Sequence, residues 1–184
     1  MSYAEYLAAE ASSDTKHEYV GGEVFAMAGG TPEHGALAMA IGARLVDAVR
    51  EKPCRVFGSD VRVRVLATDL ATDLATYPDV SVVCGKLERA ADDEHAIVNP
   101  VLIVEVLSDS TEAYDRGQKA AHYRRIPSLR EYLLVSQREP WLELFRRTEH
   151  GGWEFFEAGP GGFLELVSVG ARLDVDEVYR DPLG

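Results

Sequence analysis

The chain has 184 residues, of which 46% are hydrophobic and 27% charged, as in an ordinary soluble domain with a single hydrophobic core. Its formal net charge of −12 argues against a protein that coats duplex nucleic acid by counterion release. It does not argue against an enzyme that meets phosphates through a metal and a local basic surface. No stretch approaches the ~20 apolar residues of a membrane helix, and the N-terminus lacks a basic-then-apolar signal pattern. We therefore expect one domain over residues 1–184, in the cytoplasm and without a membrane partner.

The first part of the chain predicts a short helix, a hairpin and one long helix. Residues 2–10 have the pattern of a helix that begins with a capping box. Residues 16–28 predict a hairpin around Gly21 and Gly22, because two glycines supply the positive φ angles of a two-residue turn. Residues 31–52 predict the longest helix, with a threonine cap, a proline in its first turn and one apolar stripe that packs on a sheet.

Two strands are predicted next, over residues 54–57 and 60–66. The second alternates valines with polar residues, so Arg62 and Arg64 project from the face opposite to the valines. Two interpretations of this pair are open: a small phosphate-facing edge, or ordinary solvated charge.

Residues 66–77 contain three copies of a four-residue unit that begins Leu-Ala-Thr, which we interpret as an expanded connection within a hairpin. Residues 77–84 predict a further strand, and residues 85–98 a solvated loop. The cysteines, Cys54 and Cys84, each lie alone in a strand-like stretch without metal-ligand spacing. We interpret them as reduced core residues of a cytoplasmic protein.

The central element of the chain is the apolar, branched run of residues 101–107, which is interrupted once, by Glu105. Its polar boundaries predict a central strand buried on both faces. An isolated buried carboxylate tends to protonate, so Glu105 needs a basic side chain, a set of backbone donors or a metal ion as its partner.

The rest of the chain predicts a helix, a strand and a hairpin. Residues 115–125 have a helical pattern in which Asp115 and Gln118 stand in capping-box register. Residues 131–135 predict another buried strand, and residues 141–156 a C-terminal hairpin. The remaining residues are expected to form edge structure.

Two acids on separate predicted strands point to a metal site. Asp79 directly follows Pro78 and lies 26 residues before Glu105, enough for a strand, a loop and a return to an adjacent strand. Mg²⁺ takes oxygen ligands and keeps several waters, so these two carboxylates and the backbone carbonyl of Val106 would suffice. The ordinary alternatives are a turn aspartate after proline and a glutamate paired with Lys119 or an arginine.

Several motifs together resemble a known family. They are Tyr77-Pro78-Asp79-Val80, Val104-Glu105-Val106-Leu107-Ser108, Asp115-Arg116-Gly117-Gln118-Lys119 with Tyr123, the Glu18-Tyr19-Val20-Gly21-Gly22-Glu23 hairpin, and His34. This combination resembles the Uma family of restriction-endonuclease-like proteins in the PD-(D/E)XK nuclease superfamily. The resemblance implies an α/β (α+β) fold, with a restriction-endonuclease-like mixed central sheet flanked by helices and with N-terminal and C-terminal hairpins. It also implies a divalent metal, Mg²⁺ or Mn²⁺, and hydrolysis of phosphodiester bonds in nucleic acid, with DNA as the expected form.

One residue departs from the motif of that superfamily. The resemblance places Asp79 at the aspartate and Glu105 at the second acid, but Leu107 stands where the strand lysine belongs. The superfamily can place this lysine on a neighbouring helix, and Lys119 is the candidate. Our hypothesis is that Asp79, Glu105 and the Val106 carbonyl hold the metal while Lys119 stabilises the charge that develops on the phosphate.

Two other hypotheses stay open. A catalytically silent member would keep the fold as a nucleic-acid-binding or protein-interaction module, consistent with the acidic charge and with Leu107. A hydrolase of another small phosphorylated substrate would use the same metal. A homodimer is compatible with the nuclease hypothesis, because a cut through both strands needs two sites.

Four further residues have a functional and an ordinary interpretation. Glu18 could approach the site or be exposed, and His34 could contact a phosphate or simply pack. Asp115 is more simply a helix cap, and Tyr123 a core aromatic with a hydrated hydroxyl. The basic residues between positions 111 and 130 are either a phosphate-facing surface or solvated charge.

Overall fold

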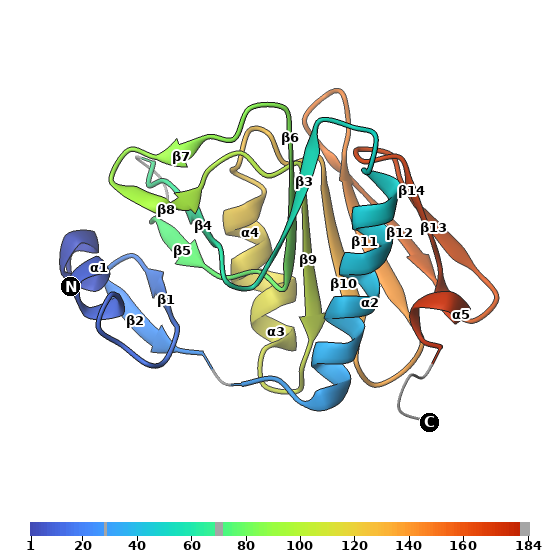
Figure 1. The fold of residues 1–184 in the computed structure, drawn as a ribbon, viewed down its shortest axis with the longest axis horizontal. Helices are drawn as coiled ribbons and strands as arrows, with labels where there is room; N and C mark the ends of the chain where they lie inside the picture. Colours follow the sequence, from blue (N-terminus) through green and yellow to red (C-terminus); the bar gives the residue numbers. More distant parts are fainter. Residues whose placement is uncertain (28, 69–71, 181–184) are drawn as a thin grey trace.

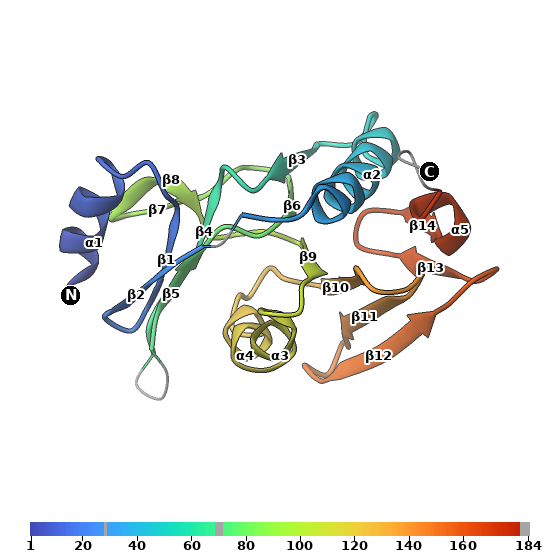
Figure 2. The same cartoon turned by 90° about the horizontal axis from the view of Figure 1, so that it is seen from below.

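The computed structural model describes residues 1–27, 29–68 and 72–180. Two six-stranded sheets and one two-stranded sheet form its framework. Figure 1 shows the N-terminal sheet beside a central sheet, with the two-stranded sheet on the far side of the central one. The helices α2 and α3–α4 cover opposite faces of the central sheet (Figure 2). This mixed α+β architecture agrees with the predicted fold class.

The central sheet carries the predicted buried strand in its middle. Its strand order is β12-β11-β10-β9-β6-β3, and only β9 and β10 within it run parallel. The members are β3 Cys54–Gly58, β6 Val80–Cys84, β9 Leu102–Leu107, β10 Glu131–Ser136, β11 Leu142–Arg147 and β12 Trp153–Ala158. Every residue of β9 is buried, as its apolar composition predicts.

The N-terminal sheet has the order β2-β1-β5-β4-β8-β7. Its members are β1 His17–Val20, β2 Glu23–Ala26, β4 Arg62–Val65, β5 Leu74–Thr76, β7 Arg89–Ala90 and β8 Asp93–Ile97. The prediction of a solvated loop over residues 85–98 is therefore wrong. The acidic residues in this stretch suggested a loop, but it contains β7 and β8, and β8 pairs in parallel with β4.

Local signals at the N-terminus predicted their elements correctly. Helix α1, Tyr3–Glu10, begins with the expected capping box, in which Ser2 and Glu5 satisfy each other's backbone. The β1–β2 hairpin turns through Gly21 and Gly22, at φ 54° and 101°. Ala28, the last residue of the predicted hairpin stretch, and residues 69–71 of the repeat lie outside the described residues.

Arg62 and Arg64 correct the expectation of an exposed basic edge. Both are buried, although the valines of β4 do alternate with them. Arg62 holds both carboxylate oxygens of Asp93, at 2.8 and 2.9 Å, and Arg64 donates to Asp73 at 2.8 Å. Arg64 also lies over the ring of Tyr3 in α1, at 3.5 Å from the centroid. The alternation was predicted correctly, but α1 covers the face from which the arginines project.

The helices that flank the central sheet are α2, Pro32–Ala48, and the composite α3 Glu112–Tyr114, π-helical η1 Asp115–Lys119 and α4 Ala120–Tyr123. Thr31 caps α2, and the buried stripe of this helix packs on β6, β9 and β10, as predicted. The predicted cap role of Asp115 is wrong. This residue lies inside the composite helix, buried, at the start of the π-helical turn.

The C-terminal segment closes the core instead of forming loose edge structure. It contains β13 Phe163–Leu166, β14 Ala171–Asp174 and α5 Val175–Val178. Its apolar residues join the cluster formed by α2 and β9. The backbone at Val167 and Ser168 also donates to Glu131 of β10, which is fully buried.

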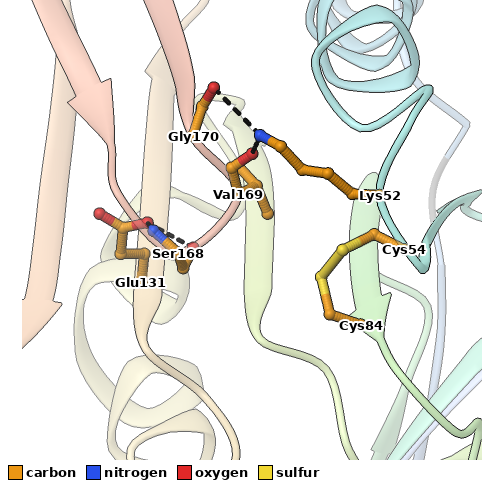
Figure 3. Close-up of a disulfide and its surroundings, with 7 residues drawn as sticks. All are labelled: Lys52, Cys54, Cys84, Glu131, Ser168, Val169 and Gly170. Atoms are coloured by element: carbon orange, nitrogen blue, oxygen red, sulfur yellow. Dashed lines mark hydrogen bonds between the residues drawn. A yellow bond between two sulfur atoms is a disulfide. The ribbon is translucent and has the colours of Figure 1, made fainter.

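A disulfide joins Cys54 and Cys84, so the prediction of two reduced cysteines is wrong (Figure 3). The two residues are 30 positions apart in the sequence but directly opposite each other in the antiparallel β3–β6 pair, with Cα atoms 4.0 Å apart. Only the register of the sheet reveals this proximity. Because disulfides are typical of oxidising compartments, the cysteines give no support to a cytoplasmic location. Among the described helices, none is long and apolar enough to cross a membrane.

Candidate active site

The structure brings Asp79 and Glu105 together at the junction of β6 and β9. Asp79 directly precedes β6, which pairs with β9 so that Val80 lies opposite Val104. The Val106 N–H donates to Asp79 Oδ2 at 2.7 Å, and the Asp79 N–H lies 3.5 Å from Glu105 Oε2. Backbone geometry therefore holds the two acids beside each other.

Lys119 points at this junction from the composite helix. Its Nζ lies 2.9 Å from Glu105 Oε1, 3.0 Å from Glu18 Oε1 and 3.4 Å from Asp115 Oδ1. The lysine is 5% exposed, so it faces the sheet and not bulk solvent. The π-helical turn, which ends at Lys119, delivers this side chain, and β9 carries Leu107 where a strand lysine would stand.

Three further residues approach the same acids. His34, in the first turn of α2, lies with Nε2 2.8 Å from Asp79 Oδ1. Tyr123 donates its hydroxyl to Glu105 Oε1 at 2.7 Å, and the whole residue is buried, so the expected hydrated hydroxyl is wrong. Glu18 reaches Lys119 from the β1–β2 hairpin and accepts a hydrogen bond from Thr76.

The sequence contained some signals for these contacts. Tyr123 follows Lys119 by four residues, the spacing that puts two side chains on one helical face. Glu18 and His34 belonged to the motifs that carry the family resemblance. Nothing local in the sequence indicates that the hairpin folds over the end of β9.

Several titratable groups of the site have shifted pKa values. Burial raises the pKa of Glu105 to about 8; the Lys119 ammonium opposes this rise, and Asp79 adds to it. Burial also raises the pKa of Asp115. Burial alone would lower the pKa of Lys119, but Glu105 and its other neighbours outweigh that effect and raise it well above the ordinary value. The hydrogen bond to Asp79 raises the pKa of His34. Such clusters of shifted groups are typical of functional sites.

The donor atoms fit a hard divalent cation. Among the described residues, no three His, Cys, Asp or Glu side chains are arranged as a ready-made metal site. Mg²⁺, however, needs only one or two carboxylates and keeps several waters, and Asp79 and Glu105 lie side by side. The Val106 carbonyl leaves the extended β9 on the same side as the N–H that contacts Asp79. Three buried carboxylates, of Glu18, Glu105 and Asp115, share the single ammonium of Lys119, and Asp79 adds a fourth acid beside Glu105. Apart from its 3.4 Å ion pair with Lys119, the Oδ1 atom of Asp115 has no hydrogen-bond partner. A divalent cation would offset this surplus of negative charge.

The acids open into one large cleft of about 1850 Å³, which extends between the β1–β2 hairpin, α2 and the start of α3. The basic residues of positions 111–130 do not surround it, apart from Lys119. Arg116 instead pairs with Glu112 and Glu143, and Arg124 lies over the rings of Phe145 and Trp153. The expectation of a phosphate-facing surface on this segment is not supported.

The fold is of the restriction-endonuclease-like class. A crystal structure from Anabaena variabilis ATCC 29413, described as "a putative nuclease belonging to DUF820", superimposes with a TM-score of 0.78. The similarity covers 98% of both chains at 17% sequence identity, so it shows a shared fold. Residues 3–176 match the model of the family described as "Uma2: Putative restriction endonuclease", and the chain belongs to this family.

Two relatives come from Synechocystis sp. (strain ATCC 27184 / PCC 6803 / Kazusa). The "Uncharacterized protein slr1290" is 36% identical over 180 residues, which is 98% of this chain and 92% of the relative. The "Uncharacterized protein sll1609" is 34% identical over 153 residues, which is 83% of this chain and 84% of the relative. The similarity to slr1290 thus extends over nearly the whole chain, the candidate site included.

Proposed function

We propose that the protein is a Mg²⁺- or Mn²⁺-dependent endonuclease that hydrolyses phosphodiester bonds in nucleic acid, with DNA as its substrate. The convergence of Asp79, Glu105 and Lys119 on one point of a large cleft carries this proposal. Membership of a nuclease family supports it.

The two acids and one carbonyl have the role of metal ligands. Asp79, Glu105 and the Val106 carbonyl would hold the ion, which when bound activates water and neutralises charge on the phosphate. The Val106 N–H and His34 each occupy one oxygen of Asp79 and so fix the orientation of this carboxylate. Tyr123 donates to one oxygen of Glu105 and so fixes the orientation of that carboxylate.

Lys119 acts as a cation and hydrogen-bond donor, and not as a general base. Its neighbouring carboxylates raise its pKa, so it stays protonated at neutral pH. A protonated amine beside the metal ligands stabilises negative charge that develops on the phosphoryl oxygens. This assignment accounts for the leucine at position 107, because the helix supplies the amine that the strand lacks.

Cleavage assays with matched variants test the proposal. Supercoiled DNA, linear duplex and single-stranded DNA are incubated with Mg²⁺, Mn²⁺ or EDTA. We expect metal-dependent cleavage by the wild type, and loss of cleavage in Asp79→Asn, Glu105→Gln and Lys119→Met.

Glu131→Gln is the matched control, because Glu131 is a buried, ion-paired glutamate on the adjacent β10 that does not line the cleft. This variant should cleave as well as the wild type in the fraction that is folded. If the folded wild type cleaves nothing with either metal, the proposal is wrong and the alternative of a catalytically silent binding module is favoured.

A further inference from the structure

Acidic residues outnumber lysines and arginines in the lining of the cleft, which is unexpected for a protein that binds along a duplex backbone. Nine carboxylate residues line it, against two lysines and one arginine. The acids are Asp14, Glu18, Glu23, Asp47, Asp60, Asp79, Glu105, Asp109 and Asp115.

Each of the three basic residues is already in an ion pair. Lys16 lies 2.6 Å from Asp60, Arg138 lies 2.7 Å from Asp109, and Lys119 contacts the acids of the site. The described lining of the cleft therefore offers no uncommitted Lys or Arg to a row of phosphates. A duplex is held mainly through cations that displace its counterions, so another kind of contact must hold the substrate.

An exposed aromatic ring stands next to the acids. Phe25 lies directly opposite Glu18 in the antiparallel β1–β2 pair. Directly opposite residues of such a pair point to the same face, with Cβ atoms about 4.5–5.5 Å apart. Glu18 contacts Lys119, so the register of the hairpin places Phe25 beside the candidate active site. Phe25 is 51% exposed and lines the cleft.

The wall around Phe25 is also apolar. Exposed or half-buried hydrophobic residues continue along the cleft from β2 to the outer face of α2 and to β3: Ala26, Met27, Met39, Ala43, Val46, Val56 and Phe57. Of these, Met39 is 73% exposed and Val46 52%. The surface next to the acids thus suits the flat face of an unpaired base better than a phosphate backbone.

We propose that the cleft accepts a single-stranded segment of nucleic acid and that Phe25 determines this specificity by stacking on an unpaired base. The inference rests on the proposed nuclease function and names its substrate class. Proteins that bind single strands combine a basic groove with exposed aromatic side chains on which bases stack, and every base has a face that can stack. In this cleft the lysines and the arginine are ion-paired, so stacking on Phe25 would be the main contact. A paired base in a duplex does not expose that face, so Phe25 discriminates against duplex.

Binding measured by fluorescence anisotropy tests the proposal. The probes are a short labelled single-stranded DNA, RNA of the same sequence and the corresponding DNA duplex, each with Ca²⁺ present. The wild type should bind the single strands more tightly than the duplex. Since few phosphates are neutralised, log Kd should depend only weakly on log salt concentration. The RNA probe distinguishes a requirement for deoxyribose from recognition of the base face alone.

The variants are Phe25→Ala and Phe25→Trp, with Phe163→Ala as the matched control. Phe163 is 44% exposed on β13 and does not line the cleft. Phe25→Ala should weaken single-strand binding by at least about fivefold, the loss expected for one stacked base, without lowering the thermal midpoint. Phe25→Trp should retain the binding, and Phe163→Ala should bind like the wild type.

Equal or tighter binding of duplex, an unchanged Kd in Phe25→Ala, or no binding of single strands would each overturn the inference. The nuclease proposal is judged separately, by metal-dependent cleavage that Glu105→Gln abolishes. A protein that cleaves duplex in a Glu105-dependent manner while Phe25→Ala binds normally would retain the function and lose the single-strand specificity.

Discussion

Two buried clusters of charged residues lie on either side of β1 and β5, and they differ in the ratio of acids to cations. In the N-terminal sheet, Arg62 holds Asp93 through two hydrogen bonds and also donates to Tyr77 at 2.8 Å. Tyr3 completes the carboxylate shell of Asp93. This cluster matches its acid with an arginine and satisfies both carboxylate oxygens.

The cluster at the end of β9 has more acids than cations. Glu105 shares Lys119 with Glu18 and Asp115, and its pKa is raised to about 8, whereas the pKa of Asp93 is lowered. A buried acid paired with one cation is costly to separate from it, which is typical of a structural role. A group of acids that outnumber their cations and have shifted pKa values is typical of a functional site. We therefore interpret the first cluster as structural and propose the second as a ligand-binding site.

The largest expected effect is on stability, from breaking the matched cluster. Arg62→Met leaves Asp93 without its main partner in a buried position. Loss of one member of a buried pair costs about 3–5 kcal/mol, which we expect in the free energy of unfolding measured with urea. Arg172→Met, which removes an exposed pair with Asp174, is the control and should leave the midpoint nearly unchanged. A similarly small effect of Arg62→Met would remove the distinction between the clusters.

The next effect is on activity, from the unmatched cluster. Glu105→Gln should reduce cleavage by at least about 10²-fold, as expected when a group that stabilises the transition state is removed. The same change should lower the unfolding midpoint less than Arg62→Met does, because Lys119 keeps Glu18 and Asp115 as partners and an amide can still accept from Tyr123. Parallel measurement of initial cleavage rates and urea unfolding checks both parts. A loss of activity that merely follows a loss of folded protein would contradict the assignment.

The smallest effect is the response of the matched cluster to acid. Burial alone would raise the pKa of Asp93, but hydrogen bonds from Arg62 and Tyr3 outweigh it and hold the pKa below its ordinary value. A carboxyl with a lowered pKa in the folded state stabilises the protein above the ordinary pKa of about 3.9. That contribution is lost as the pH falls through the folded-state pKa.

Urea unfolding at a series of pH values below 5 should therefore show a steeper decline for the wild type than for Asp93→Asn. Identical acid profiles for the two proteins would show that Asp93 does not contribute in this way.

The elements that were predicted correctly depend on neighbours in sequence. The residues nearby in sequence are enough to determine the capping box at Ser2, the glycine turn at Gly21 and the buried strand around Glu105. The errors concern residues whose environment comes from elsewhere in the chain. Arg64 is buried because α1 lies over it, and Cys54 meets a cysteine 30 positions away because of strand register.

The candidate site divides in the same way. Asp79 and Glu105 were predicted as site residues from a proline-aspartate pair, a charge in an apolar run and the family resemblance, and Lys119 from that resemblance and the missing strand lysine. The structure places the three side by side. The spacing of Tyr123 from Lys119 only put the two residues on one helical face. The hydrogen bond from Tyr123 to Glu105 and the approach of Glu18 depend on the π-helical turn and on the placement of the hairpin. Sequence patterns thus predicted the candidate acids and the lysine, and packing determined which other side chains reach them.

We propose above all that the acids around Glu105, which outnumber their cations, accommodate a divalent cation. Titration calorimetry with Mn²⁺ tests it most directly, with the wild type, Asp79→Asn and, as the control, Asp93→Asn from the matched cluster. We predict that the wild type and Asp93→Asn bind Mn²⁺ at a site that Asp79→Asn lacks. Absence of binding to the folded wild type, or equal binding by Asp79→Asn, would contradict it.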